Sequence, residues 1–433
     1  MFYYTINNTV CASRVPLDGF PEAPEKERAN VSVYLFTRDM QTSRSAFLVN
    51  DPSLLSQETE GAFWLSASKL REAASQTGAA PGGGSVDTAD FPDEALTKAA
   101  SEMRLRAVNT AFPGWEERLH TAPPFVPDNK KKTVHILAVG DVGSGVLTGL
   151  HLLGGDVIEK IGIFDVAEKN VARWEFEINQ ITEPWAYDKM PEVYPVTREH
   201  LFDCDVFLFT ASAGIPPVGS DVKDVRMFQF EKNAKIISEY ARQARDTGFR
   251  GLFCAISDPV DPLAKAAFLA SNTDENGTFD GKGLLPEQIQ SFGLGVMNAR
   301  AAYYAKRDKR FTRFLSEGRA FGPHGKELVI ADSIDAYDEA LSGELTALVV
   351  NANMKMRELG FKPFVAPAYS SAALSILLTL RGAWHYGGVF LGGIYMGCKN
   401  RYTPNGQEIE ILDLPDALFE KIAYAEKTLH DVN

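Results

Sequence analysis

The segment VHILAVGDVGSG, residues 134–145, places an apolar run directly before a glycine-rich turn. The run has the composition of a buried strand, and the residues after it have that of a helix. In the spacing AxGxxG, Ala138 stands where a dinucleotide-binding turn usually has its first glycine. Such a turn brings backbone N–H groups close to a pyrophosphate at a helix N-terminus, and we expect this contact at Gly140, Val142 and Gly143. An ordinary strand-to-helix turn has the same spacing, so this segment alone leaves both interpretations open.

The next expected strand, KIGIF (160–164), is followed by Asp165. An acid at about twenty residues beyond the glycines accepts hydrogen bonds from both ribose hydroxyls of a bound dinucleotide. A carboxylate there also repels a 2′-phosphate, so Asp165 favours NAD over NADP. The alternative role is a helix N-cap, and the two roles are compatible.

Outward from this unit, apolar β-rich runs alternate with helix-length amphipathic segments. This alternation of strand-like and helix-like segments is typical of a parallel sheet that is covered by helices on both faces. It predicts a Rossmann-type NAD-binding domain over residues 131–285. The remaining residues, 286–433, predict an α+β catalytic domain. Its expected elements are helices around 287–310 and 337–359, apolar runs at 370–381 and 387–397, and an amphipathic helix from 415.

Two breaks precede the nucleotide-binding unit. GAAPGGGS (78–85) has the composition of a linker or long loop, and APPFVP (122–127) with the charged residues after it is typical of a domain boundary. The residues before these breaks predict a small α/β extension over 1–130. Its expected elements are strands at 2–6, 31–36 and 45–49 and a helix at 96–105. The predicted fold class is therefore α/β, with a Rossmann-type parallel sheet, an α+β catalytic domain and this extension.

Composition narrows the class of partner. The chain has 433 residues and a formal net charge of -13, a field that repels a polyphosphate backbone, so nucleic acid is excluded as an expected partner. No stretch reaches the ~20 apolar residues of a membrane span, and the N-terminus lacks a signal-peptide pattern, so we expect a cytoplasmic protein. The four cysteines are far apart, without CxxC or zinc-site spacing, and are expected to be reduced thiols that bind no metal.

From about residue 133 on, an ordered series of segments resembles the lactate/malate dehydrogenase family. The strand DVFLFTASAG (205–214) and the residues after it resemble the third nucleotide strand and the mobile active-site loop of that family. In the family, an Arg of this loop lies seven residues before a helix Asn, and here the pair is Arg226 and Asn233. Three further segments follow in the same order. ISDPVD resembles the S-N-P-V-D segment, GVMNAR resembles the L-D-x-x-R helix, and GPHG resembles the G-x-H-G segment (256–261, 295–300 and 322–325).

The resemblance implies a role for each matched residue. His324 is the proton donor and acceptor, Arg300 clamps the substrate carboxylate, and Arg226 polarises the carbonyl and helps to exclude water. It also implies a substrate contact at Asn298, and cofactor contacts at Ala211 and Asn233. Family members are usually dimers or tetramers, so a homo-oligomer is implied as well.

Two departures concern the proton relay. Met297 stands where the family has an Asp that orients the catalytic His, and a thioether cannot take that role. Loss of an orienting Asp in a related constellation costs about four orders of magnitude in rate. Asp258 stands where the family has Asn, close to the same neighbourhood. We therefore hypothesise that Asp258 partners His324 from the other side, raises its pKa and takes part in catalysis.

Two more departures concern specificity and cofactor affinity. In the family the start of the mobile loop carries Gln for lactate-type or Arg for malate-type substrates, whereas here it reads Ile215-Pro216-Pro217, with Lys223 in an apparent insertion. An apolar residue in the pocket favours an apolar substrate side chain, and an inward Lys223 favours malate. Asp141 adds a negative charge next to the expected pyrophosphate.

The sequence favours an NAD-dependent 2-hydroxy-acid dehydrogenase that acts on a lactate-like or malate-like substrate. One alternative is a non-catalytic NAD-binding protein on the same fold, whose relay has decayed. Another is an NAD-dependent glycosidase of related plan, which needs a metal-binding Cys and His pair that the sequence does not offer.

Overall fold

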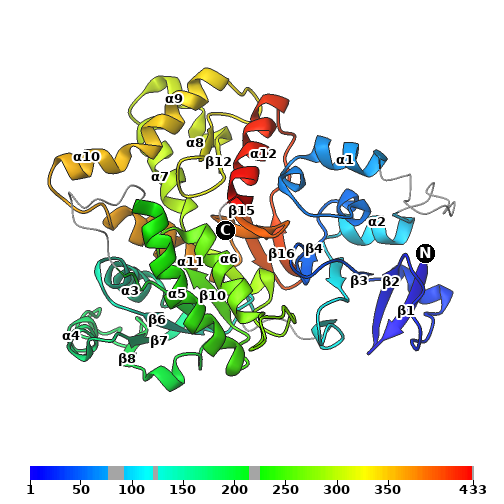
Figure 1. The fold of residues 1–433 in the computed structure, drawn as a ribbon, viewed down its shortest axis with the longest axis horizontal. Helices are drawn as coiled ribbons and strands as arrows, with labels where there is room; N and C mark the ends of the chain where they lie inside the picture. The colour runs from blue at the N-terminus through cyan, green and yellow to red at the C-terminus, as the bar shows by residue number, and fades with distance from the viewer. Residues whose placement is uncertain (77–91, 120–124, 214–224, 432–433) are drawn as a thin grey trace.

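The computed structural model describes residues 1–76, 92–119, 125–213 and 225–431. A nine-stranded sheet runs through it in the order β16-β15-β14-β11-β10-β9-β6-β7-β8 (Figure 1). The strands from β11 to β8 are parallel, in the order of a doubly wound nucleotide-binding fold. The predicted α/β class and Rossmann-type sheet are therefore confirmed. These six strands are β6 (Lys132–Leu137), β7 (Ile158–Phe164), β8 (Glu192–Pro195), β9 (Val206–Phe209), β10 (Leu252–Ala255) and β11 (Ile289–Ser291).

Both faces of this parallel sheet are buried, which explains its continuous apolar runs. In β9, Val206 and Leu208 join the core under α3 and α11, while Phe207 and Phe209 join the core under α5 and α6. Successive strand residues point to opposite faces, so a strand covered on both sides needs apolar residues at every position. The covering helices are α3 (Asp141–Leu153), α4 (Glu168–Ile178), α5 (Val225–Asp246), α6 (Val260–Ser271) and α11 (Leu374–Leu380).

The C-terminal half extends the same sheet with three antiparallel strands. β14 (His385–Leu391) pairs with β11, and β15 (Ile394–Thr403) and β16 (Gly406–Ile409) follow it outward. Above this edge lie the strand pair and the helices that Figure 1 draws mainly in yellow. They are α7 (Leu294–Ala305), α8 (Phe314–Glu317), β12 (Arg319–Phe321), β13 (Val329–Ala331), α9 (Glu339–Val350) and α10 (Ala352–Glu358).

One expected element is partly wrong. The helix expected from residue 287 begins only at Leu294, because Ile289–Ser291 form β11 and pair with β10. A three-residue strand carries too little periodicity to be distinguished from the start of a helix. The domain boundary expected at 285 therefore falls before the sixth parallel strand, and the sheet continues across it.

The N-terminal extension forms its own five-stranded sheet, in the order β1-β2-β3-β5-β4. The three strands expected from the sequence are present as β1 (Phe2–Ile6), β3 (Val33–Phe36) and β4 (Ala46–Leu48). The expected helix at 96–105 is shorter, because α2 ends at Ser101 and the chain turns into a strand. The other elements of the extension are β2 (Thr9–Ser13), α1 (Ala67–Gln76), α2 (Glu94–Ser101) and β5 (Arg106–Asn109). The linker expected at 78–85 lies outside the described residues.

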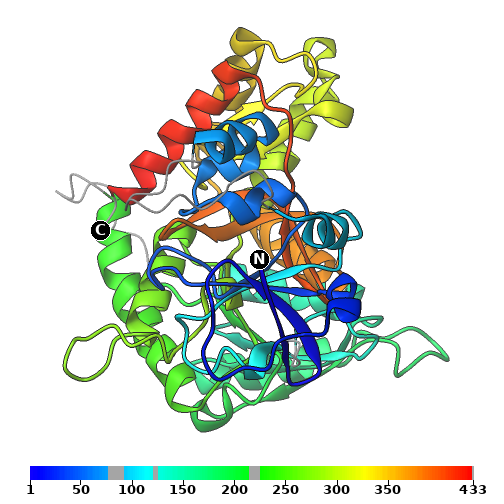
Figure 2. The ribbon, with the colours of Figure 1, turned by 90° about the vertical axis from the view of Figure 1, so that its right-hand side faces the viewer.

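The extension shares a hydrophobic core with the C-terminal half. Trp64 and Leu70 are buried in one cluster with Leu391 and with Ile422 of α12 (Asp416–His430), which lies beside the N-terminal helices in Figure 2. The backbone N–H of Ala62 donates to Glu426 Oε1 at 3.0 Å. The extension is thus packed into the molecule rather than tethered to it.

All four cysteines are free, and three of them are buried. Among the described residues, no helix combines the length and the apolar character that crossing a membrane requires.

Candidate active site

The glycine-rich turn after β6 lies at the carboxyl edge of the sheet, next to the end of β9. A Cβ at position 143 would lie 2.0 Å from the carbonyl oxygen of Ala138 and 2.6 Å from Thr210 Oγ1, so close packing requires glycine there. Gly140 precedes the first turn of α3, and a Cβ on it would meet no atom within 4 Å. The open space at this helix N-terminus fits a pyrophosphate. Ala138 has a φ of 74°, a left-handed conformation that explains why glycine is preferred at this position.

Asp165 ends β7 beside the same turn. Its Oδ2 accepts the backbone N–H of Val139 at 2.9 Å, and its Oδ1 accepts that of Ala167 at 2.9 Å. The helix-capping role considered from the sequence is not found, because Ala167 is the N-cap of α4 and the second bond is a turn contact that precedes the helix. The carboxylate is held at the end of the second strand with lone pairs to spare, which fits ribose hydroxyls. Asp141 forms an ion pair with Lys362 Nζ at 3.0 Å, so its charge is countered.

His324 is fixed by two backbone contacts. Its Nδ1 lies 2.9 Å from the carbonyl oxygen of Gly293, and since a carbonyl only accepts, Nδ1 carries the proton in this contact. Its backbone N–H donates to Asp261 Oδ2 at 3.1 Å. The neutral ring therefore presents the lone pair of Nε2, and the side chain is 13% exposed. A Cβ at position 293 would lie 2.6 Å from His324 Cβ, so glycine there allows the ring to approach.

Asp258 and Asp261 lie on either side of the turn after β10, in different environments. Asp258 Oδ1 is 3.7 Å from His324 Nε2, and its side chain is 62% exposed. Asp261 is buried and accepts a hydrogen bond from Ser291 Oγ. Burial raises the pKa of Asp261 to about 6, although the contacts of Ser291 and His324 with its carboxylate oppose this shift.

Asn233 holds the residues that follow β9 against this turn. Its Oδ1 accepts the backbone N–H of Ala213 at 2.8 Å, and its Nδ2 donates to the carbonyl oxygen of Asp258 at 2.8 Å. The carbonyl of Ala211 accepts the Ser257 hydroxyl at 2.6 Å. Asn233 is fully buried, and its side chain joins the two loops through hydrogen bonds to their backbone atoms.

Arg300 projects from α7 and is half-buried. Its guanidinium contacts Met297 Sδ at 3.6 Å and donates to Asn353 Oδ1. Burial lowers its pKa, and within the described residues no carboxylate lies at ion-pair distance from it. A half-buried guanidinium with only neutral partners is suited to a carboxylate ligand. Asn298, which is also half-buried, lies on the same helix.

The structure thus brings His324, Asp258 and Arg300 to one region at the carboxyl ends of β10 and β11. Arg226 lies in the first turn of α5, but its side chain is outside the described part of the chain, as are Ile215, Pro216, Pro217 and Lys223. The sequence interpretation missed Gly293, Asp261 and Asn353. Asp261 stood within a matched segment, whereas the contacts of Gly293 and Asn353 left no local pattern.

No protein-family model matches this chain. L-lactate dehydrogenase 1 of Lactobacillus acidophilus is 27% identical over 141 residues, which are 33% of this chain and 41% of the relative. The chain therefore aligns with about two fifths of the length of that relative.

A longer match exists with L-lactate dehydrogenase 2 of Staphylococcus aureus, which is 23% identical over 330 residues, 69% of this chain and 95% of the relative. Among solved structures, the minor L-lactate dehydrogenase of Enterococcus mundtii superposes with a TM-score of 0.57 at 19% identity. The superposition covers 70% of this chain and 98% of that one.

Proposed function

We propose that the chain is a member of the lactate/malate dehydrogenase family and an NAD-dependent dehydrogenase of a small 2-hydroxy or 2-oxo carboxylic acid. The single observation that supports this best is the geometry of His324. Its Nδ1 is hydrogen-bonded to the carbonyl of Gly293, and its Nε2 faces Asp258. Arg300, whose hydrogen-bond partners are uncharged, lies on the helix that follows Gly293.

Each side chain has a separate task in this proposal. Arg300 binds the substrate carboxylate, and Asn298, two residues before it on α7, is a further substrate contact in this proposal. His324 Nε2 takes a proton from the hydroxyl during oxidation, or gives one to the carbonyl oxygen during reduction. Arg226, from the first turn of α5, polarises that oxygen and excludes water.

The turn of Gly140, Val142 and Gly143 would hold the pyrophosphate of NAD, and Asp165 the adenosine ribose. When bound, the nicotinamide supplies or accepts the hydride. Ala211 and Asn233 would form the wall near it, where Asn233 supports the loop backbone.

Asp258 belongs to the catalytic group in this proposal. Its carboxylate faces Nε2, the nitrogen that exchanges the proton, at 3.7 Å. A negative charge there stabilises the imidazolium that forms during oxidation. Asp258→Asn should change the pH profile of turnover, and an unchanged profile would remove Asp258 from the mechanism.

The test of the function is turnover of NADH with a panel of 2-oxo acids that includes pyruvate and oxaloacetate, followed by absorbance. We expect oxidation of NADH with at least one of them, and its loss in His324→Gln. Ile215 would favour a lactate-like acid and Lys223 would favour a malate-like acid. The panel distinguishes these two preferences.

One observation favours a second candidate, a non-catalytic NAD-binding protein. Met297, at the position of the orienting acid, contacts Arg300 and leaves His324 without a charged partner on Nδ1. Binding of NADH without turnover of any acid would favour this candidate.

The family resemblance is also the basis on which we propose a homo-oligomer.

A further inference from the structure

A cavity lies at the amino ends of β10 and β11, on the side of the sheet away from His324. It has a volume of about 670 Å³ and lies between the N-terminal extension and the nucleotide-binding half. Phe249 and Arg250 line it just before β10, and Glu287 and Gln288 line it just before β11. The candidate active site lies after the carboxyl ends of these same two strands. The two sites are therefore separated by at least the length of a strand, roughly 13 Å.

The lining of this cavity is cationic although the chain is acidic. Its charged residues are five bases and two acids, against a net charge of -13 for the chain. They are Arg106, Arg118, Arg245, Arg250 and Lys282, with Glu117 and Glu287. A concave surface of one sign raises the local concentration of ligands of the opposite sign.

Three of these arginines, Arg106, Arg118 and Arg250, have no charged partner within ion-pair distance among the described residues. Arg106 Nη2 donates to the carbonyl oxygen of Arg118, and Arg118 donates to those of Pro113 and Phe112 at 3.1 and 3.3 Å. The Nε of Arg118 is buried and has no hydrogen-bond partner within the part of the chain that the structure describes. Burial lowers the pKa of Arg106 and Arg118. The charges of these guanidinium groups are therefore not paired by an acid among the described residues, and a carboxylate or phosphate in the cavity would pair them.

The acid deepest in the cavity is engaged elsewhere. Glu287 is buried, its Oε2 accepts the backbone N–H of Ser45 at 3.1 Å, and its Oε1 accepts the Ser45 hydroxyl. Burial raises the pKa of Glu287, and both of its carboxylate oxygens are hydrogen-bonded to Ser45. It therefore counters the arginines only in part.

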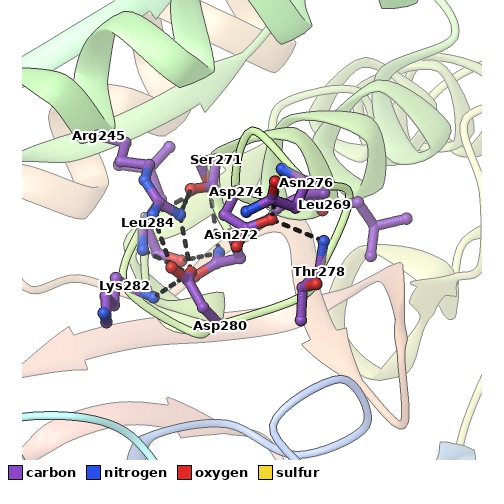
Figure 3. Close-up of polar contacts among 12 residues, drawn as sticks. Arg245, Leu269, Ser271, Asn272, Asp274, Asn276, Thr278, Asp280, Lys282 and Leu284 are labelled. Carbon is purple, nitrogen blue, oxygen red and sulfur yellow. Dashed lines mark hydrogen bonds and ion pairs between the residues drawn. The ribbon is translucent and has the colours of Figure 1, made fainter.

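One wall of the cavity is a loop that is pinned by Arg245, as Figure 3 shows. The Arg245 guanidinium binds both oxygens of Asp280 at 2.7 Å and donates to the carbonyl oxygen of Ser271 at 3.0 Å. Asp280 also accepts the backbone N–H of Lys282 at 3.1 Å. This arrangement neutralises Arg245 and fixes the backbone that presents Lys282.

The remaining wall is apolar. Phe125 and Tyr402 pack edge to face at 5.2 Å, and the Tyr402 hydroxyl donates to the carbonyl of Glu287 at 2.7 Å. Val126, Phe249 and Leu285 complete this side. The volume lies within the range of small-molecule sites, about 300–1,000 Å³.

From this lining we propose that the cavity binds a small organic anion, with an apolar body against Phe125 and Tyr402 and a carboxylate or phosphate group on Arg106, Arg118 and Arg250. The site is distinct from the proposed active site. It depends on the extension, which contributes Arg106 and Arg118.

The test uses four probes and calorimetric titration of the full chain. Benzoate and phenyl phosphate combine a ring with an anion, inorganic phosphate offers the anion alone, and benzyl alcohol the ring alone. We expect the two ring-bearing anions to bind more tightly than the other two. The tighter of them identifies the head group.

Variants locate the binding. Arg250→Gln and Arg118→Gln should each weaken it by roughly tenfold, because each removes charged hydrogen bonds. Arg242→Gln, the same change at an exposed position of α5 outside the lining, should leave it unchanged. Arg250 is exposed, so its variant should fold even if Arg118→Gln does not.

Arg300→Gln separates the two sites. If the ring-bearing anions bind this variant as they bind the wild type, the cavity is their site whatever the outcome for the dehydrogenase activity. Loss of binding in Arg300→Gln, unchanged binding in Arg250→Gln, or equal binding of all four probes would overturn the proposal.

Discussion

Gly293 is the position where one added methyl group tests the arrangement of His324 most directly. In Gly293→Ala, the new Cβ would lie 2.6 Å from His324 Cβ, 2.9 Å from His324 Cγ and 2.6 Å from Val260 Cγ2. Ordinary carbon contacts are about 3.5–4.0 Å, so the imidazole must retreat by about 1 Å. This movement breaks or stretches the 2.9 Å bond from Nδ1 to the carbonyl of residue 293.

The size of the effect follows from what that bond does. A misplacement of about 1 Å costs on the order of 10²-fold in rate, and loss of the orienting partner of a catalytic histidine costs up to about 10⁴-fold in a related constellation. We expect kcat with the best 2-oxo acid to fall by about 10²–10⁴-fold. The affinity for NADH should stay unchanged, because the glycine-rich turn and Asp165 are held by other contacts. Overpacking should lower the free energy of unfolding by about 1–3 kcal/mol.

The assay is steady-state turnover beside a fluorescence titration with NADH and a thermal unfolding curve. Gly343→Ala is the matched control, since a Cβ there meets no atom within 4 Å and the residue lies in the exposed face of α9. It should keep full turnover. In a His324→Gln background, Gly293→Ala should cause no further loss, because both changes act on one group. Turnover by folded Gly293→Ala within twofold of the wild type would refute the positioning role of Gly293.

Three other variants test separate features. Arg300→Lys keeps the charge but loses the planar fork, so kcat/KM for 2-oxo acids should fall by about 10²-fold while NADH affinity is unchanged, and a smaller loss than fivefold would contradict the clamp. Ala138→Gly removes a left-handed alanine, φ 74°, and should raise the free energy of unfolding in urea by about 0.5–1 kcal/mol, whereas a decrease would show that the turn is unstrained. Burial raises the pKa of Asp261 to about 6, so between pH values of about 4 and 6 the unfolded carboxyl is ionised and the folded one is not. The free energy of unfolding should therefore fall with rising pH by about 3 kcal/mol across this window, and Asp261→Asn should remove that part of the slope; equal slopes in the two proteins would disprove it.

The parallel sheet was predictable because its strands are buried on both faces. Runs such as Val206–Phe209 are apolar at every position, and helix-length segments separate them. Asp165 was predictable for a similar reason, since its place at the end of a strand follows from local order. β11 was not predictable, because three residues carry no period, and its place in the sheet depends on pairing with β10.

The relay around His324 shows where sequence reasoning stops. Met297 correctly indicated that no acid orients the ring from α7, but the replacement is a backbone carbonyl, which every residue possesses. In the sequence, the only sign of this contact is the glycine at position 293, which has no Cβ. Because glycine also precedes many helices where the chain merely turns, this sign is not specific. The packing of the extension against α12 is likewise invisible in the sequence, because it joins residues about 360 positions apart, as in the bond from Ala62 to Glu426.

A carbonyl and a carboxylate differ in one respect that matters for the proposed mechanism. Both fix the proton on Nδ1 and aim Nε2, but only a carboxylate adds the full charge that stabilises an imidazolium. Gly293 therefore supplies orientation alone. Asp258, at 3.7 Å from Nε2, is the carboxylate that faces the reacting side of the ring among the described residues. The two functions that one acid combines in the lactate/malate dehydrogenase family would then be divided, with the charge placed next to the substrate. Because the Asp258 side chain is exposed, its contribution to turnover should depend on ionic strength more than that of a buried orienting acid would.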